Sequence, residues 1–570
     1  MRFSRLNLPS ACPLIVLVTL SGLTPLHLTP LAGQAPGAPT VQDAIGLIQA
    51  GDMEGAAETL RKVTAAEPDN ARGWSALGFT LRQTGDTEGA IEAYEHALAF
   101  DETAPQAMYN LGVIKGASGD VDGAFEDLAS AKATGRVDLT GLGIDPAAGP
   151  IRDDPRYASL LPSEAEYADP FVEPTQIIHE WRGEAAGDQF GWVARNIGDV
   201  DGDGVDDLTT SAPTHVIGDA ANSGKIYAYS GRTGRLLWSS HGEAGDQLGL
   251  GIEAAGDVNG DGIRDVIAGA PGGDRAIVYS GVDGAVVLEL EGRAEGEFFG
   301  REVMDLGDVN SDGHDDVIVG APQSDAAGEG SGRAYVISGA DGSTLLELTG
   351  EGAGDAFGSA AGGYHDGELT IVVVGAPNAG ASGGGRTYVY VGDGLVERPT
   401  FVIDSDDTGS QLGGMFVSVV GDVDADGHPD VYASDWSNNA KGNSTGRVFV
   451  HSGRTGERLL TLTGENRGDG FGIGPADAGD VNGDGHDDLV IGAWQQADAA
   501  ASGGKVYVFS GADGSLLREV TGQVMGETFG FDATGMGDVD GDGRIDYLLT
   551  SAWSAVNGAR SGRMYIISGT

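Results

Sequence analysis

The sequence predicts a mainly β protein: a seven-bladed β-propeller of four-stranded antiparallel blades, preceded by a short all-α domain of helical repeats. Two internal periods support this prediction, because repeat architectures reveal themselves as self-similarity at a fixed spacing. A unit of 34 residues recurs near the N-terminus, and a longer unit recurs seven times from residue 176 onward. We therefore expect helical repeats over 36–136, a linker with one short helix over 137–175 and the propeller over 176–570.

The charge balance limits the classes of function. The 570 residues include 86 acidic and 33 basic side chains, which gives a formal net charge of −53. Nucleic acid is therefore not an expected partner, since binding phosphates requires clustered Lys and Arg. The excess carboxylate reflects either a solvated acidic surface or a set of cation sites, and the positions of the Asp residues favour cation sites.

Residues 1–35 have the features of an export signal. Arg2 and Arg5 precede an apolar run over 13–23, and Gly33 and Ala35 offer a cleavage point. The run is too short to cross a bilayer, so we expect a secreted protein, extracellular or at the cell surface, with the periplasm as an alternative and no membrane span. Cys12 is the only cysteine, so the mature chain cannot use disulfides, and bound metal is the candidate for stabilising it.

The N-terminal period belongs to a helix-turn-helix unit. The hexamers GDMEGA, GDTEGA and GDVDGA begin at Gly51, Gly85 and Gly119. Small residues at fixed places let paired helices pack closely. The middle copy resembles a tetratricopeptide repeat in the spacing of Trp74, Leu77, Gly78, Ala90, Tyr94 and Ala97. Two interpretations stay open: a groove for a peptide partner, or a spacer or oligomerisation arm.

Each copy of the longer unit is interpreted as one propeller blade. It begins with an aromatic residue or Leu followed by Gly, and continues through an Asp-rich loop, an apolar strand, a Gly/Ser-rich loop and two further strands. The copies begin at Phe190, Leu248, Phe299, Phe357, Leu412, Phe471 and Phe529. A lone strand over 176–181 precedes them and the last copy ends after its third strand. We predict that the lone strand completes the seventh blade and closes the ring, which pairs the exposed edges.

The second strand of several copies ends in a Gly-Ala-Pro motif. The motif occupies 269–271, 320–322 and 375–377, and it is replaced by Ser211-Ala212-Pro213 in the first copy. Together with the Phe-Gly pair and the Asp-rich loop between them, it resembles the FG-GAP repeats of integrin α subunits. This resemblance covers the chain from residue 176 to the end, and it implies a propeller whose upper face contacts protein partners.

Six of the seven copies carry D-x-[DN]-x-D-G-x-x-D directly after the first strand. Hard oxygen ligands at alternate positions suit calcium, which takes about six to eight oxygens in a flexible shell. The oxygen-bearing side chains at positions one, three, five and nine are Asp199, Asp201, Asp203 and Asp207; Asp257, Asn259, Asp261 and Asp265; Asp308, Asn310, Asp312 and Asp316; Asp422, Asp424, Asp426 and Asp430; Asp480, Asn482, Asp484 and Asp488; Asp538, Asp540, Asp542 and Asp546. Position seven varies and is expected to supply a backbone carbonyl; it is Val205, Ile263, His314, His428, His486 and Arg544.

We predict about six Ca²⁺ ions, one in each of blades 1, 2, 3, 5, 6 and 7. An EF-hand would need Glu at position twelve and helices on both sides, whereas this position is Thr210 or Ala268 and the flanks are strands. Dockerin modules share the motif but are helical too. The remaining alternative is that the Asp runs are solvated turns, but repulsion among the carboxylates would make an empty loop costly. The fourth copy has lost the ligands over 362–369, so calcium is expected to be structural and optional for a blade.

Recognition is expected on the loops between second and third strands, because variable loops on a rigid scaffold usually carry binding. These loops range from the short 271–275 to the longer 434–446. In copies five to seven, Trp436, Trp494 and Trp553 replace the Pro of the Gly-Ala-Pro motif. They are candidates for a ligand face that binds sugar or protein, and the alternative is that they fill space between blades.

These observations favour an adhesion or recognition module that binds an extracellular protein or carbohydrate, with the helical repeats as a second surface for protein. No catalytic residue is predicted, because the sequence has no HExxH or GxSxG motif. Two alternatives stay open. One is a calcium-dependent polysaccharide-active enzyme, since propeller enzymes assemble their sites from distant loops. The other is a structural protein of a cell-surface assembly.

Overall fold

The computed structural model of the protein describes residues 39–381, 383–474 and 477–570. Contacts divide these residues into two compact units. The first contains the residues up to Val137 together with Asp145–Leu160, and the second contains Asp138–Ile144 and Leu161–Thr570. The predicted export signal lies outside the described residues. Within the described ranges, no helix has both the length and the apolar character that a membrane span requires.

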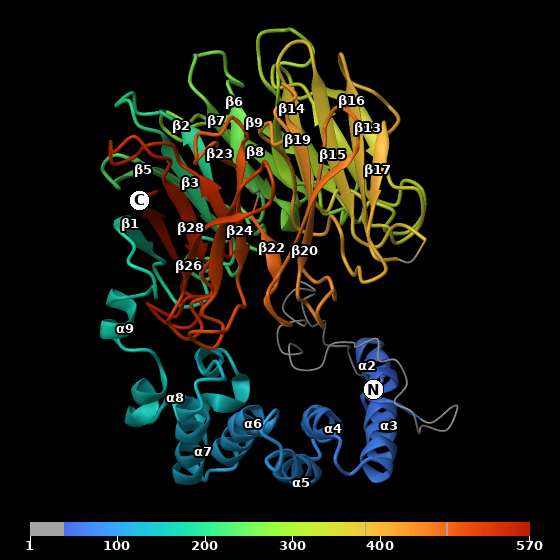
Figure 1. Ribbon diagram of the computed structural model, residues 1–570, viewed down its shortest axis with the longest axis vertical. Coiled ribbons are helices and arrows are strands. Elements are labelled where there is room, and N and C mark those ends of the chain that lie inside the picture. The colour runs from blue at the N-terminus through green and yellow to red at the C-terminus, as the bar shows by residue number, and fades with distance from the viewer. Residues whose placement is uncertain (1–38, 382, 475–476) are drawn as a thin grey trace. The chain divides into compact units, whose positions relative to one another are not determined.

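The first unit contains three consecutive helix pairs, labelled in Figure 1. They are α2 (Val41–Gln49) with α3 (Met53–Ala66), α4 (Ala71–Thr84) with α5 (Thr87–Ala97), and α6 (Ala104–Ala117) with α7 (Val121–Ala133). The repeated hexamer marks the start of the second helix of each pair, because its Asp is the N-cap. Asp86, for example, accepts a hydrogen bond from the Gly89 N–H at 3.0 Å, which satisfies a free donor of the first turn.

Small residues determine how closely the helices of a pair approach, as the sequence predicts. The buried Tyr94 ring on α5 packs over Gly78 on α4, and its nearest carbon lies only 2.7 Å from where a Cβ of residue 78 would be. Any larger residue at position 78 would therefore push the two helices apart. The predicted helical-repeat architecture is confirmed in this region.

The segment predicted as a linker is folded. It contains η1 (Thr140–Gly143), η2 (Pro146–Ala148), α8 (Gly149–Arg152), η3 (Pro155–Leu160) and α9 (Glu164–Ala168), and the short helix expected near Tyr157 is the 3-10 helix η3. In the second unit, the Phe171 ring packs 4.6 Å from the Phe529 ring and 5.2 Å from the Tyr565 ring. The Val172 N–H also donates to the Thr521 carbonyl at 2.9 Å. The residues just before the first blade therefore belong to the propeller's core.

The described residues of the second unit form seven antiparallel sheets arranged as the blades of a propeller (Figure 1). Blade 1 contains β2 (Ala194–Gly198), β3 (Asp207–Ala212), β4 (Lys225–Tyr229) and β5 (Leu236–His241); blade 2 contains β6 (Ile252–Gly256), β7 (Asp265–Ala270), β8 (Arg275–Tyr279) and β9 (Val286–Glu291), with η4 (Pro271–Gly273) after β7; blade 3 contains β10 (Val303–Gly307), β11 (Asp316–Ala321), β12 (Arg333–Ile337) and β13 (Thr344–Thr349); blade 4 contains β14 (Ala361–His365), β15 (Thr370–Ala376), β16 (Arg386–Gly392) and β17 (Phe401–Asp404). Blade 5 contains β18 (Val417–Val420), β19 (Asp430–Asp435), β20 (Arg447–His451) and β21 (Arg458–Thr463); blade 6 contains β22 (Phe471–Ile473), β23 (Asp477–Gly479), β24 (Asp488–Ala493), β25 (Lys505–Phe509) and β26 (Leu516–Thr521); blade 7 contains β27 (Ala533–Gly535), β28 (Tyr547–Ser551), β29 (Arg563–Ile567) and β1 (Ile177–Arg182).

The Phe-Gly and Gly-Ala-Pro motifs set the spacing between neighbouring blades. Within blade 3, the Gly300 N–H donates to the Gly320 carbonyl at 3.0 Å, so the two motifs are joined. A side chain at Gly269 of blade 2 would overlap the Gly300 carbonyl oxygen, and the backbones can approach this closely only because residue 269 is glycine. Phe299 is buried between the same two blades. The repeated motifs are therefore the packing surface of one blade against the next.

The lone N-terminal strand closes the ring. β1 pairs antiparallel with β29, with Trp181 opposite Met564, so the predicted closure of blade 7 is confirmed. Arg563 at the start of β29 is fully buried and joins three segments. Its guanidinium lies 3.0 Å from Glu180 of β1 and 3.4 Å from the buried Glu527, and it donates to the Tyr167 carbonyl at 2.7 Å.

We expect Arg563→Ala to lower the free energy of unfolding of the propeller by about 3–5 kcal/mol, because it leaves the buried Glu527 without its cation. The matched control is Arg333→Ala at the same place in blade 3, where the side chain is 20% exposed and the nearest acid, Glu347, is 3.8 Å away. Exposed pairs contribute about 1 kcal/mol or less, so the control should lose far less stability. Urea unfolding followed by tryptophan fluorescence measures both, and equal losses would contradict the assigned role of Arg563.

Candidate functional site

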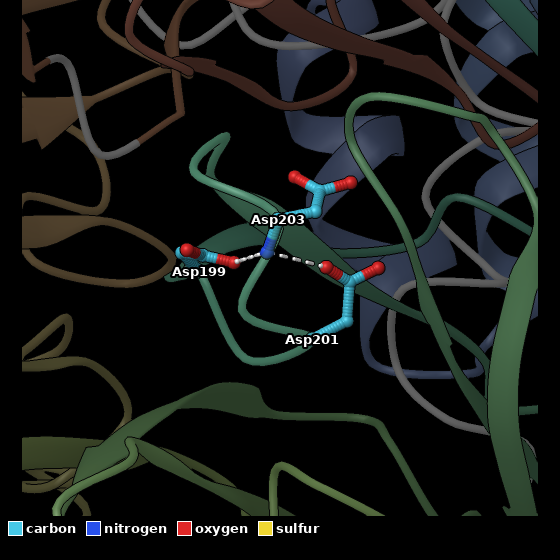
Figure 2. Close-up of side chains that lie close together, drawn as sticks. All are labelled: Asp199, Asp201 and Asp203. Carbon is cyan, nitrogen blue, oxygen red and sulfur yellow. Dashed lines mark hydrogen bonds between the residues drawn. The ribbon is translucent and has the colours of Figure 1, made fainter.

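The six Asp-rich loops connect the first and second strands of blades 1, 2, 3, 5, 6 and 7. Figure 2 shows the loop of blade 1, where Asp199, Asp201 and Asp203 lie around the Asp203 amide. That amide N–H donates to Asp199 Oδ1 at 2.9 Å and to Asp201 Oδ1 at 3.1 Å. The backbone of the loop therefore holds two carboxylates close together, against their mutual repulsion.

The same backbone hydrogen bonds recur in all six loops. The amide of position six donates to the carboxylate of position one at 2.7–2.9 Å. The amide of position five donates to the side-chain oxygen of position three at 2.9–3.1 Å. The amide of position seven donates to the carboxylate of position five at 2.9–3.1 Å. Six blades thus present the predicted oxygens in one shared loop conformation.

The spacing of these oxygens fits a calcium ion. Two ligands at the usual calcium–oxygen distance of about 2.3–2.6 Å can be at most about 5 Å apart. In three loops, three carboxylate oxygens lie within 4.8 Å of one another: Asp199, Asp201 and Asp203; Asp422, Asp424 and Asp430; Asp538, Asp540 and Asp542. In the other three loops, position three is an Asn, whose amide oxygen is a neutral ligand of the same hard type. The all-oxygen donor set suits Ca²⁺ better than metals that prefer nitrogen or sulfur.

The carboxylate at position nine lies deeper than the others and joins three parts of its blade. Asp207 is buried, and its Oδ2 accepts from the Val200 and Asp201 amides at 2.9 and 3.0 Å. Its Oδ1 accepts from Gly231, in the turn after the third strand, at 3.0 Å. The other five loops repeat this bond to the turn at 2.8–3.2 Å through Asp265, Asp316, Asp430, Asp488 and Asp546.

Burial makes the ionised form of these carboxylates costly. It raises the pKa of Asp207 to about 6, although three backbone amides favour the anion, and the nearby Asp201 charge adds to the rise. Burial likewise raises the pKa of Asp265 and Asp316 to about 6 and that of Asp430 to about 7. The pKa values of Asp488 and Asp546 are raised for the same reason. A divalent cation beside such a group would favour the anion and reverse the shift.

The side chains at position seven have a role that the sequence prediction missed. The prediction uses only the backbone carbonyl of this position. In blades 3 and 6, the imidazole Nδ1 of His314 and of His486 lies 2.7 Å from the carbonyl oxygens of Val258 and Val423 in the preceding loop. The sequence feature that could have indicated this role is His followed by two Asp, which occurs in these two loops and in none of the other four.

Blade 4 has a simple turn where the other blades have the loop. Asp366 accepts from the Glu368 and Leu369 amides at 2.9 and 2.8 Å, which closes the turn. The second strand begins with Thr370, whose hydroxyl lies 2.8 Å from His365 Nδ1. The blade therefore keeps its four strands without the acidic loop.

The three candidate tryptophans lie together in one aromatic cluster. The Trp494 ring is 4.7 Å from the Trp553 ring and 6.3 Å from the Trp436 ring. Phe531 and Trp192 extend the cluster, with ring centroids 4.9 Å apart. Trp494 and Trp553 are only 4% and 8% exposed, and Trp436 is half-buried. This arrangement favours packing between blades over a ligand face, because buried rings offer little area for stacking.

A cavity of about 430 Å³ lies on the propeller axis, lined by residues from the first strand of every blade. Charges are paired around it. Arg195 contacts Glu253 at 2.6 Å and Asp532 at 2.5 Å. Glu302 lies close to this network, 3.7 Å from Arg301, and burial raises its pKa to about 8. Burial of Glu302 thus outweighs the stabilising charges of Arg301 and Arg195.

Together, the seven blades, the acidic loops and the helix pairs identify the class. The chain is an FG-GAP repeat β-propeller protein with tetratricopeptide-like helical repeats. The FG-GAP repeat family matches residues 252–288, 302–337 and 476–509, and the TPR repeat family matches 80–119.

Among curated proteins, the chain is similar to integrin α chains. It is 29% identical to integrin alpha-PS3 of Drosophila melanogaster over 26% of this chain and 15% of that protein. It is 30% identical to integrin alpha pat-2 of Caenorhabditis elegans over 39% of this chain and 20% of that protein, and 32% identical to human integrin alpha-IIb over 35% and 22%. The chain therefore spans about a fifth of the length of these relatives.

We expect the pH dependence of stability to change in Glu302→Gln. The folded-state pKa of Glu302 is raised from its ordinary 4.5 to about 8, so protonation favours folding below about 4.5 and this contribution is lost as the pH rises through about 8. The melting temperature of the wild type should therefore fall relative to that of the variant between about pH 4.5 and 8, and run parallel to it above. Both melting temperatures are measured in calcium-containing buffer. If they change with pH in the same way over the whole pH range, the pKa of Glu302 is not raised.

Proposed function

We propose that this protein is a calcium-stabilised recognition module whose propeller binds an extracellular protein or carbohydrate. The observation that carries the proposal is the single loop conformation, repeated in six blades, that gathers only oxygen ligands. Asp, Asn and a backbone carbonyl in each loop would hold one ion, which would supply positive charge and fix the loop. The similarity to integrin α chains supports an extracellular location and a role in adhesion.

Calcium binding of this kind would matter for the stability of the ring. If free calcium is ~1 mM and each site has a Kd of ~0.1 mM, binding contributes about 1.4 kcal/mol per site and ~8 kcal/mol over six independent sites. A whole domain has a net stability of roughly 5–15 kcal/mol. We infer that calcium is structural and that the chain acts by binding rather than by catalysis.

The partner would contact the loops between the second and third strands. These loops differ strongly in shape, since the loop of blade 2 is the single turn η4 while the loop of blade 1 extends over 213–224 and presents Val216 with 52% of its surface exposed. An exposed apolar side chain beside a short neighbouring loop suits a protruding group of a partner.

The helical repeats would provide a second surface for protein. In this unit, Arg82 is half-buried and pairs with Asp145 at 2.8 Å.

We expect the purified chain to bind about six calcium ions and to melt at a markedly lower temperature in excess chelator. Asp538→Ala should lower the count by about one ion, because it removes a ligand that two loop amides orient. Asp366→Ala is the matched control, since Asp366 closes the turn of blade 4 and should leave the count unchanged. Equilibrium dialysis with calcium-45 gives the counts, and an unchanged melting temperature after chelation would contradict a structural role for calcium.

A second prediction concerns the partner face. Arrays of extracellular proteins and glycans, probed with the full chain in calcium, should yield a ligand whose binding falls in Val216→Asp. Val286→Asp serves as the control, because Val286 is similarly exposed but lies on the fourth strand β9, away from these loops. Equal loss in both variants, or arrays without any ligand, would contradict the assigned face.

A further inference from the structure

Two of the acidic loops are physically attached to a neighbouring loop. In blade 3, positions seven and eight are His314 and Asp315. Asp315 Oδ2 accepts from the Asp257 amide of blade 2 at 2.6 Å, and the Asp315 amide donates back to the Asp257 carbonyl at 3.1 Å. His314 Nδ1 lies 2.7 Å from the Val258 carbonyl oxygen, which can only accept, so the imidazole donates. We call these contacts the His–Asp clasp.

The same clasp joins the loops of blades 5 and 6. Asp487 Oδ2 accepts from the Asp422 amide at 2.7 Å, and the Asp487 amide donates to the Asp422 carbonyl at 3.0 Å. His486 Nδ1 lies 2.7 Å from the Val423 carbonyl oxygen. In both cases the clasp grips positions one and two of the preceding loop, and position one is a predicted calcium ligand.

The clasp also needs space beside the backbone of the gripped loop. The residue just before position one is Gly256 in blade 2 and Gly421 in blade 5. A side chain at either glycine would overlap the carboxylate of Asp315 or Asp487. Glycine precedes position one in all six loops, so the His-Asp sequence of the following blade is the feature that distinguishes these two pairs of blades.

The other neighbouring loops are joined differently. In loop 1, position eight is Asp206, whose carboxylate accepts from Asn196 Nδ2 of its own blade at 2.9 Å. In loops 2 and 7, position eight is Arg264 and Ile545, which cannot accept a hydrogen bond. Over the part of the chain that the structure describes, no bond from position eight to the preceding loop occurs between loops 7 and 1, 1 and 2, or 6 and 7. The molecule thus contains both coupled and uncoupled neighbours.

We propose that loops 2 and 3, and loops 5 and 6, bind calcium as cooperative pairs, whereas loops 1 and 7 bind independently. The inference rests on the proposed function. An ion in loop 3 would fix its closing segment, because the expected ligands at His314 and Asp316 flank Asp315. A fixed Asp315 holds Asp257 and Val258, so loop 2 loses less conformational freedom when it binds its own ion. By linkage, an ion in loop 2 must favour binding in loop 3 by the same factor.

The experiment removes one ligand and counts the ions that remain. Asp312→Ala inactivates loop 3, and Asp542→Ala inactivates the unclasped loop 7 at the same position; Asp203 of loop 1 is less suitable because it also pairs with Arg232 at 3.2 Å. Each full-length variant is dialysed against calcium-45 over a range of free calcium. Circular dichroism in saturating calcium checks that both remain folded.

We expect both variants to lose about one ion at saturating calcium. Near the wild-type midpoint, where each site is about half occupied, Asp542→Ala should lose about half an ion. Asp312→Ala should lose about 0.8–1 ion there, because the affinity of loop 2 is also lower by about 5-fold or more. Asp315→Ala, which keeps every predicted ligand, should raise the midpoint for about two ions, and Asp206→Ala should leave it unchanged. Equal losses in Asp312→Ala and Asp542→Ala at all calcium concentrations would overturn the pairing, although calcium binding itself would stand. A wild-type chain that binds no calcium would overturn the proposed function as well.

Discussion

The buried carboxylate at position nine is the interaction on which the acidic blades depend. It is the first residue of the second strand in blades 1, 2, 3, 5 and 6, it receives amides from the start of its own loop, and it receives another from the turn after the third strand. One side chain therefore fixes the loop, the strand and the turn together. Its cost is a negative charge in a buried place, which a cation bound as proposed in the same loop would offset. Where the loop is lost, in blade 4, the contact between Thr370 and His365 lies at the start of the strand instead.

Much of this architecture could be predicted because it is written in residues at fixed spacing. Seven Phe-Gly or Leu-Gly pairs, six acidic loops and the lone strand before Phe190 were enough to predict the blades and the closure of the ring. The reason is that each motif has a local geometric role, such as the close approach of Gly269 to Gly300. A local requirement that recurs in every blade leaves a period in the sequence.

What could not be predicted depends on contacts that occur once or twice. Tyr167 and Phe171 lie among prolines without any periodicity, so no repeated motif indicated that they pack on blades 6 and 7. The burial of Trp494 and Trp553 follows from the curvature of the ring, which no single blade encodes. The role of His314 and His486 was hidden because their partners lie in the preceding blade, 56 and 63 residues earlier.

Apart from the contacts of His314 and His486, these singular contacts are concentrated where the ring is closed. Closing the ring brings together β1 and β29, which are far apart in the chain. This has an entropic cost that the other blades do not have, because short turns connect their strands. The buried guanidinium of Arg563, the Phe171 ring and the aromatic cluster of Trp192, Phe531 and Trp553 all lie at blade 7 or its neighbours. The seam is thus strengthened by contacts that have no counterpart in most other blades.

Features that the blades share and features that differ between blades would contribute differently to specificity for a partner. Six loops of one conformation can stabilise a ring, but they cannot distinguish one partner from another, because each presents the same oxygens. Six calcium ions would add a charge of about +12 to a chain of −53, so the surface would stay acidic. Selectivity would then come from features that differ between blades, such as the loops between the second and third strands to which we assign the proposed partner.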